Sequence, residues 1–322
     1  MSTISSFMGE HFKHFNARET LDAAEGWKKL LDDGGEMFLT VAGAMSSAEL
    51  GISMAKMIRA DKVHGICATG ANLEEDLFNL FANKEYAVVP HYKDLSPEDE
   101  VALRDQGFNR VTDTCIPESV MRHTEDILVE LWKSAEERGK AKFPWEHVYD
   151  LLDNKELEKH YQVPAEHSWV LAAKEKNLPI FTPGWEDSTL GNIFAARAIQ
   201  GRLAGHTAVR TGTEQMQRLV EWYLERVERS TPVGFFQIGG GIAGDFPICV
   251  VPLIIQDLKR DVPFWSYFAQ IGDSITSYGS YSGAVPNEKI TWYKLDVDTP
   301  KFMINSDATI VAPLIFSYVL GE

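Results

Sequence analysis

The stretch EMFLTVAGAMSSAELGISMAKMIRADKVHGICATGANLEEDLFNLFA, residues 36–82, repeats one pattern twice. Glu36–Ala42 and Val63–Ala68 are short apolar runs typical of buried strands. Apolar residues at helical spacing follow each run, first in Ser47–Ala60 and then after the turn at Thr69–Asn72. This alternation predicts one large α/β domain whose parallel sheet carries helices on both faces, with ligands bound at the carboxyl ends of the strands.

Small residues directly follow both predicted strands, at Gly43, Ala44, Gly70 and Ala71. They would let a ligand approach the backbone closely. Glu74 and Glu75 fall in the first turn of the second helix, where the helix dipole favours acidic residues whatever the function. These two carboxylates therefore have either a structural or a ligand-binding interpretation.

A third strand, Gly234–Ile238, leads into Gly239–Gly244, which satisfies the pattern GxGxxG where a helix could begin. In that context the pattern indicates dinucleotide binding. The acidic residue expected about 20 positions further on would be Asp257 or Asp261, and neither lies at a predicted strand end. A variant of the Rossmann fold is therefore expected rather than the standard one. Residues 96–176 are charged, and we expect them to be largely helical.

Composition narrows the functional classes. The chain has 322 residues and a net charge of -16, which argues against a nucleic-acid surface and suits cationic ligands. Its three cysteines form no CxxC pair, so we expect no disulfide framework, no metal site and a reducing, cytoplasmic compartment. Residues 1–31 lack the pattern of a signal peptide and are expected to form a helical arm, separate from a domain at 32–322.

A lysine lies two residues after a tryptophan in PNEKITWYKLD, Pro286–Asp296. If Ile290–Leu295 forms a strand, Trp292 and Lys294 share one face. An aromatic wall that excludes water favours a neutral amine, which Schiff-base chemistry requires. The alternative is an ordinary strand lysine with a cation–π neighbour.

The segment SGAVPNEKITWYKL, residues 282–295, resembles the part of deoxyhypusine synthases that carries their essential lysine. In that family a Ser-Gly-Ala-x-Pro-x-Glu run precedes Trp-x-Lys. The resemblance implies that Lys294 accepts an aminobutyl group as an imine. It also implies that Trp292 keeps water out and that Glu288 handles the protons of the amine.

Further segments resemble the same family from about Phe38 to the C-terminus, among them TGANLEEDL at 69–77 and PGWEDSTLGN at 183–192. The resemblance implies NAD as the cofactor, bound by Ser47, Thr69, Gly70, Ala71, Glu75, Asp187, Thr189, Gly239, Gly241, Gly279, Ser280 and Asp307. Asp307 is equally a sound helix N-cap.

The chain departs from the family where the polyamine would bind. The positions implied to contact substrate are Asn192, Asp245, Tyr281 and Ser282. The family has aspartates in place of Asn192, Tyr278 and Tyr281, and a catalytically important histidine in place of Asp245. Loss of formal negative charge should weaken a site for cations, so the substrate is expected to differ.

The resemblance implies a homotetramer built from dimers, with active sites at the dimer interface. It also implies NAD-dependent transfer of an aminobutyl group from a diamine or polyamine, through a lysine imine, to an amine. Three alternatives stay open: a small-amine acceptor giving a homospermidine-type product, a true deoxyhypusine synthase acting on a lysine of a translation factor, and a non-catalytic protein that binds NAD or amines.

Overall fold

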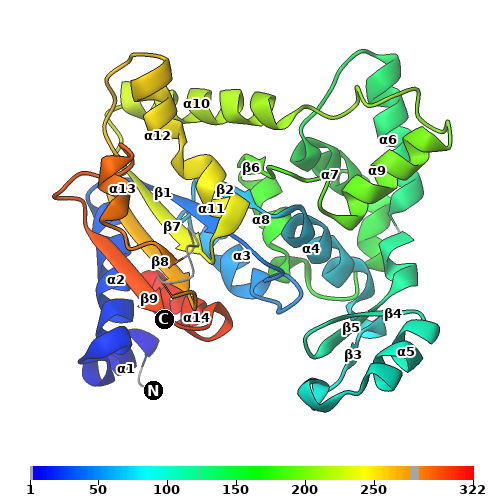
Figure 1. Ribbon diagram of the computed structural model, residues 1–322, viewed down its shortest axis with the longest axis horizontal. Helices are drawn as coiled ribbons and strands as arrows, with labels where there is room; N and C mark the ends of the chain where they lie inside the picture. The colour runs from blue at the N-terminus through cyan, green and yellow to red at the C-terminus, as the bar shows by residue number, and fades with distance from the viewer. Residues whose placement is uncertain (1–2, 123, 276–282) are drawn as a thin grey trace.

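The computed structural model describes residues 3–122, 124–275 and 283–322. Its main sheet has six strands in the order β6-β2-β1-β7-β8-β9, and every neighbouring pair is parallel (Figure 1). The strands are β1 (Glu36–Val41), β2 (Gly65–Ala68), β6 (Ile180–Phe181), β7 (Val233–Ile238), β8 (Tyr267–Gly272) and β9 (Lys301–Asn305). When these six strands are numbered in chain order, their order in the sheet is 3-2-1-4-5-6, which is that of a Rossmann fold. The order reverses between β1 and β7. The predicted fold class is confirmed.

Side chains alternate along each strand, so apolar side chains point to both faces of the sheet. Helices cover both faces. Phe236 and Tyr267 belong to the core on the side of α2 and α14, whereas their neighbours Phe235 and Phe268 belong to the core beneath α10 to α12. The longer helices are α1 (Ile4–His11), α2 (Phe15–Asp32), α3 (Gly51–Arg59), α4 (Gly70–Ala82), α6 (Glu125–Glu137), α7 (Pro144–Leu152), α9 (Thr189–Ile199), α10 (Gly212–Glu228), α11 (Gly241–Ile248) and α14 (Ala308–Leu320). The shorter ones are α8 (Trp169–Glu175), α12 (Val250–Pro252) and α13 (Glu288–Thr291).

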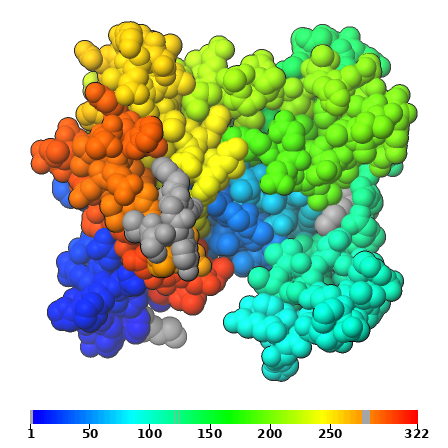
Figure 2. All heavy atoms as spheres, in the orientation of Figure 1, coloured from blue at the N-terminus to red at the C-terminus, as the bar shows by residue number. Residues whose placement is uncertain are grey.

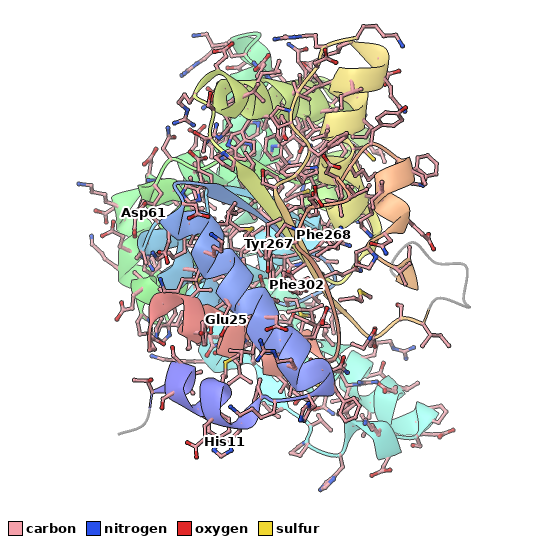
Figure 3. All side chains as sticks on the ribbon, turned by 90° about the vertical axis from the view of Figure 1, so that its left-hand side faces the viewer. His11, Glu25, Asp61, Tyr267, Phe268 and Phe302 are labelled. Atoms are coloured by element: carbon pink, nitrogen blue, oxygen red, sulfur yellow. The ribbon has the colours of Figure 1, made fainter. Side chains whose placement is uncertain are left out.

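Helix α2 packs tightly across the sheet, as Figure 3 shows around Tyr267 and Phe302. A Cβ atom at Gly26 would lie 2.8 Å from the Tyr267 ring and 3.1 Å from the Phe302 ring, so only glycine allows this approach. The Tyr267 hydroxyl donates to the Ala23 carbonyl at 2.7 Å. The C-terminal half of α2 is thus part of the main core, and the division of residues 1–31 from the rest stays a prediction.

A small antiparallel sheet stands apart from the main one, at the lower right of Figure 1. Its strands are β3 (Ala87–Val88), β5 (Thr114–Pro117) and β4 (Phe108–Val111), and helix α5 (Pro97–Asp105) packs on β4. The sequence predicted mainly helix over residues 96–176, which include β4 and β5. These strands were missed because they are two to four residues long and only partly buried, which leaves little hydrophobic periodicity.

The predicted strand over Ile290–Leu295 is wrong. Residues 288–291 form the short helix α13, and the Lys294 amide then donates to the Lys289 carbonyl at 3.1 Å. The chain rejoins the sheet region only at an isolated bridge between Leu295 and Trp265. A pattern of alternating side chains over only six residues is compatible with a strand and with a helical turn, and for this reason the prediction of a strand was wrong.

Tyr293 ends this turn in the left-handed conformation, with φ of 57°. A side chain in that region costs about 1 kcal/mol or more, because its Cβ approaches the carbonyl oxygen. We therefore expect Tyr293→Gly to be about 1 kcal/mol more stable than Tyr293→Ala, since both variants lack the ring and only glycine relieves the backbone. Urea unfolding of the two variants measures the difference. Equal stabilities would contradict the strain.

Candidate active site

The loops after β1 and β7 meet where the strand order reverses, which is where open α/β sheets bind ligands. Gly239 has φ of 76°, and a Cβ atom there would lie 3.0 Å from that of Ala42. A Cβ atom at Gly244 would lie 2.6 Å from the Gln237 amide, so α11 packs closely on β7. The GxGxxG segment therefore has the tight turn and close helix packing of a dinucleotide motif. It follows β7, however, and not the first strand.

Asn72 ties helix α4 to the loop after β1. Its side chain is fully buried, and its amide nitrogen lies 2.8 Å from both the Gly43 carbonyl and the Thr69 hydroxyl. Its amide oxygen accepts from the Ser46 backbone at 2.9 Å. Thr69 in turn caps α4 and donates to Gly43 at 2.8 Å. Sequence reasoning missed Asn72, because a single asparagine near a helix start usually indicates only capping.

Asn72→Ala should lower the free energy of unfolding by about 2 kcal/mol, because it leaves several buried backbone groups unsatisfied. Chemical denaturation measures the loss. Asn109→Ala is the control, because its side chain is exposed and bonds to Glu118 at the surface. If the two alanine variants were equally stable, Asn72 would not be the link described.

Helix α4 also positions several predicted cofactor residues. The Glu75 carboxylate accepts from the Ser47 backbone at 3.2 Å, and Glu74 accepts from the backbone of Thr189 at 2.8 Å and of Leu190 at 2.7 Å. Burial raises the pKa of Glu74 to about 7, and burial also raises the pKa of Glu75. Helix α4 begins at Gly70, so Glu74 and Glu75 lie in its second turn and not, as the sequence predicted, in the first. They hold the loop after β1 and the start of α9 together.

Gly70 packs closely against Ser188, the residue that caps α9. A Cβ atom at Gly70 would lie 2.8 Å from the Cβ atom of Ser188. Ala71 follows Gly70 in α4. The structure therefore gathers Ser47, Thr69, Gly70, Ala71, Glu75 and Thr189 at one edge of the sheet. Asp187 is exposed in the turn before α9, and Gly241 begins α11 with φ of 61°.

A hollow of about 740 Å³ opens beside this edge. It is lined by residues from the loop after β1, from the small sheet and from the start of α14, namely Ala44, Met45, Ser47, Ala48, Glu49, Tyr92, Val111, Thr112, Asp113, Thr114, Asp307 and Thr309. Figure 2 shows the surface recessed between the C-terminal segment in red and the small sheet in cyan. Two predicted cofactor residues, Ser47 and Asp307, line this one hollow, and Asp307 also caps α14 through the Thr309 amide at 2.7 Å.

Lys294 is only 5% exposed, with its Nζ atom 5.8 Å from the centre of the Trp292 ring. Trp292 itself is 66% exposed, so in the single chain it borders Lys294 without enclosing it. Burial raises the pKa of the Cys249 thiol, and the charge of Lys294 and its hydrogen bond to the thiol act in the opposite sense. Asp245 of α11 also acts on this thiol. The structure thus brings Asp245 and Lys294 into one cluster.

The remaining predicted positions differ in their surroundings. Glu288 is exposed at the start of α13. The Asn192 amide donates to the Ser188 carbonyl at 2.6 Å, within its own helix. Tyr278, Gly279, Ser280, Tyr281 and Ser282 lie outside the described residues. Sequence reasoning also missed Lys289 and Cys249, since lysines are rarely buried and a lone cysteine carries no pattern.

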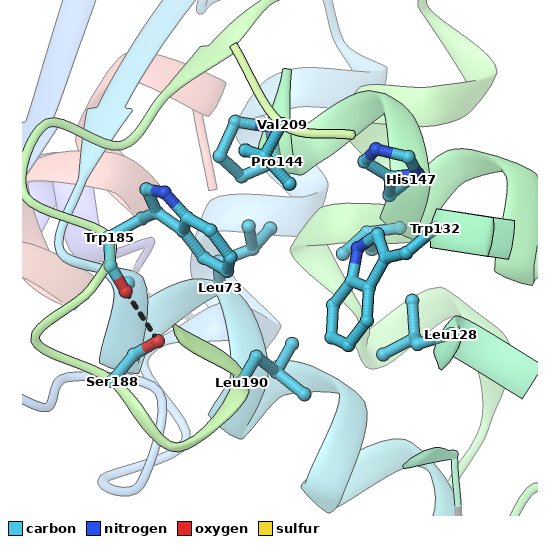
Figure 4. A pocket seen from close by; sticks show the side chains of 11 residues that line it. Leu73, Leu128, Trp132, Pro144, His147, Trp185, Ser188, Leu190 and Val209 are labelled. Carbon is cyan, nitrogen blue, oxygen red and sulfur yellow. Dashed lines mark hydrogen bonds between the residues drawn. The ribbon is translucent and has the colours of Figure 1, made fainter. Parts of the chain in front are cut away.

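A second cavity lies behind the start of α4, between Trp132, Trp185, Leu73 and Leu190 (Figure 4). Its volume is about 20 Å³, which is room for about one water molecule. The Ser188 hydroxyl beside it donates to the Trp185 carbonyl at 2.7 Å. This cavity therefore belongs to the core.

The described residues show neither a metal-binding cluster nor a membrane-spanning helix. Among residues 3–122, 124–275 and 283–322, no three His, Cys, Asp or Glu side chains are grouped so as to hold a metal ion. In the same residues, none of the helices combines the length and apolar character needed to span a membrane.

Comparison with known proteins agrees with this arrangement. The model of the family described as deoxyhypusine synthase matches residues 6–319. A "Deoxyhypusine synthase-like protein" from Thermosynechococcus vestitus is 30% identical over 292 residues, covering 88% of this chain and 70% of that protein. Another protein of the same name, from Cyanothece sp., is 28% identical over 303 residues, covering 92% and 73%.

Among solved structures, a "putative deoxyhypusine synthase" from Entamoeba histolytica has a similar fold, with a TM-score of 0.60 and 13% sequence identity. The match covers 98% of this chain and 92% of that one. The likeness in fold agrees with the family match over nearly the whole chain, and the family is one of transferases. The chain belongs to the deoxyhypusine synthase family.

Proposed function

We propose that this protein is an NAD-dependent transferase that moves an aminobutyl group from a diamine or polyamine to a small amine, giving a homospermidine-type product. The observation that carries the proposal is the buried amine of Lys294, which lies in the family's Trp-x-Lys motif beside Asp245 and Cys249. A buried lysine is the usual form of an imine-forming nucleophile.

The residues at the carboxyl edge of the sheet fit NAD. The turn at Gly239 admits no Cβ atom without a close contact, and the hollow that Ser47 and Asp307 line is large enough for a nucleoside. Ser47, Thr69, Gly70, Glu75, Gly239 and Asp307 would hold the cofactor. When bound, NAD supplies the acceptor for a hydride from the amine donor.

The chain's own residues would carry the transfer. The Lys294 Nζ atom attacks the electrophilic carbon of the oxidised donor, and the C–N bond to the departing amine breaks as a C=N bond to lysine forms. The acceptor amine then attacks the same carbon and releases Lys294, which leaves a C=N bond in the product. Return of the hydride taken from the donor would reduce this bond to the secondary amine, so the cofactor is regenerated. Asp245 would hold an ammonium group of the substrate, while Glu288 would take up the protons that the attacking amines lose.

A true deoxyhypusine synthase, with a protein lysine as acceptor, is the second candidate. Its support is family membership alone. Asn192 and Asp245 stand where the family has an aspartate and a catalytic histidine, and these changes favour the small-amine acceptor. A non-catalytic protein that binds NAD or amines is the third alternative, and retention of Glu288, Trp292 and Lys294 counts against it.

We also propose that the protein assembles as a homotetramer made of dimers. The exposed Trp292 beside the buried Lys294 supports a second subunit that completes the site. Light scattering coupled to gel filtration would give the mass, and a monomer would count against the assembly. The free thiols Cys67, Cys115 and Cys249 support a reducing, cytoplasmic compartment.

Mass spectrometry of the amines tests the activity. The purified protein is incubated with NAD and either putrescine, spermidine or agmatine, and a new polyamine is the expected product. If none forms, a translation factor with its target lysine is the next acceptor to supply. Absence of product with both classes of acceptor would overturn the transferase and favour the binding protein.

A further inference from the structure

Two glutamines on neighbouring strands hold the turn that follows β7. Gln237 of β7 and Gln270 of β8 lie opposite each other in the sheet, and both side chains are fully buried. Each amide nitrogen donates to the Gly239 carbonyl at 3.0 Å. Glutamine is mostly exposed in proteins, and a buried carbonyl usually needs only one donor. Two buried glutamines on a single carbonyl therefore need an explanation.

The arrangement is not the one that stability alone would favour. A carbonyl accepts only from the nitrogen of an amide, so the contact with Gly239 fixes the orientation of the Gln237 side chain. Its Oε1 atom is then buried without a hydrogen-bond partner among the described residues. Gly244 of α11 closes over the same amide, since a Cβ atom there would lie 2.6 Å from the Gln237 Nε2 atom. An apolar side chain of similar shape would avoid the unsatisfied oxygen, so the contact with Gly239 has a role beyond packing.

The contacts fix the direction of one peptide unit. The Gly239 amide donates to the Ile271 carbonyl at 2.8 Å, and Gly239 has φ of 76° in the left-handed region. The next peptide is planar and trans, so the Gly239 carbonyl and the Gly240 N–H point in opposite directions. Because the glutamines hold the carbonyl on the packed face of the sheet beneath α11, the Gly240 N–H points away from that face.

We propose that Gln237 and Gln270 are positioning residues for the cofactor, which together hold the Gly239 carbonyl so that the Gly240 N–H donates to an oxygen of the NAD pyrophosphate. Glycine adopts many backbone conformations, so without the glutamines the peptide between Gly239 and Gly240 could rotate. Backbone N–H groups bind phosphate oxygens where a glycine turn leads into a helix, as this turn leads into α11. The inference rests on the proposed function, because it takes NAD as the bound cofactor.

Calorimetric titration of the full chain with NAD tests the pair. Methionine is close to glutamine in size but has no N–H to donate. In Gln237→Met and in Gln270→Met one donor remains, so the Kd for NAD should stay within about threefold of that of the wild type. In the double variant the Kd should rise about thirtyfold, which is the usual contribution of one hydrogen bond to a charged group. The effect of the double variant should thus exceed the product of the two single effects.

Tyr267→Phe is the matched control. It removes a buried hydrogen bond from the same strand as Gln270, on the opposite face of the sheet. This variant should lose stability and keep the Kd for NAD of the wild type, which separates positioning of the turn from general destabilisation. A folded double variant with an unchanged Kd would overturn the inference, and a single variant with the full thirtyfold loss would show that the glutamines do not act together.

If the double variant does not fold, amide hydrogen exchange of the wild type decides, resolved to single residues by fragmentation. NAD should slow exchange at Gly240, and an unchanged rate there would contradict the inference. A wild-type protein that binds NAD without the glutamine effect would refute the inference alone. One that shows the effect but makes no polyamine would refute the proposed transfer alone, and failure to bind NAD would overturn both.

Discussion

Lys294→Ala should reduce polyamine formation at least about a thousandfold, because removing a covalent nucleophile abolishes the route that depends on it. The variant should still bind NAD with nearly unchanged affinity. Lys294 lies in the cluster with Asp245 and Cys249, whereas the proposed cofactor residues are held by Asn72 and Glu75 around the loop after β1. Product analysis by mass spectrometry and calorimetric titration with NAD measure the two effects.

Two controls make this result interpretable. Lys294→Arg keeps a cation at the position but offers no amine that forms an imine, so it should be as inactive as the alanine variant. Lys176→Ala changes a partly exposed lysine paired with Asp61, far from Lys294 in the sequence, and should retain full activity. Borohydride added during turnover should attach an aminobutyl group to Lys294 in the wild type only. Product formation by Lys294→Ala at a tenth of the normal rate would exclude lysine catalysis here.

The sequence predicted the parts of the fold that depend on long buried segments. The strands β1, β2 and β7 are largely apolar, and each precedes a turn rich in small residues. The apolar run and the turn residues therefore both indicate a buried strand that ends at the turn. Strand β8 was not predicted, although it is as buried as β7 and, like β7 with Gln237, carries one buried glutamine, Gln270. Its amide donates to the Gly239 carbonyl at 3.0 Å, a long-range contact that no local pattern reveals.

One part of the candidate site could likewise be predicted from the sequence, and another part could not. Ser47, Thr69 and Glu75 follow predicted strands, and topology alone brings them to one edge. The environment of Lys294 could not be obtained this way, because its burial depends on a turn that the alternation misassigned as a strand. A buried lysine gives no hydrophobic signal, so only the three-dimensional structure shows it.

Glu74→Gln should make stability less sensitive to pH. Burial raises the pKa of Glu74 from 4.5 to about 7, so over that range the folded protein holds a proton that the unfolded chain releases. The resulting stability is fully present below about pH 4.5 and is lost as the pH rises through 7. Glutamine cannot titrate. Between pH 5 and pH 8 the variant should gain about 2 to 3 kcal/mol relative to the wild type, measured by urea unfolding.

Glu214→Gln is the matched control, because Glu214 caps α10 through the Thr211 amide at 2.8 Å and the cap bonds lower the pKa of this carboxyl. Its contribution is present above the unfolded pKa and is lost as the pH falls, so the pH trend of this variant should have the opposite sign. If the stability of both variants relative to the wild type changed with pH in the same direction, burial of Glu74 would not be the cause of its pH dependence.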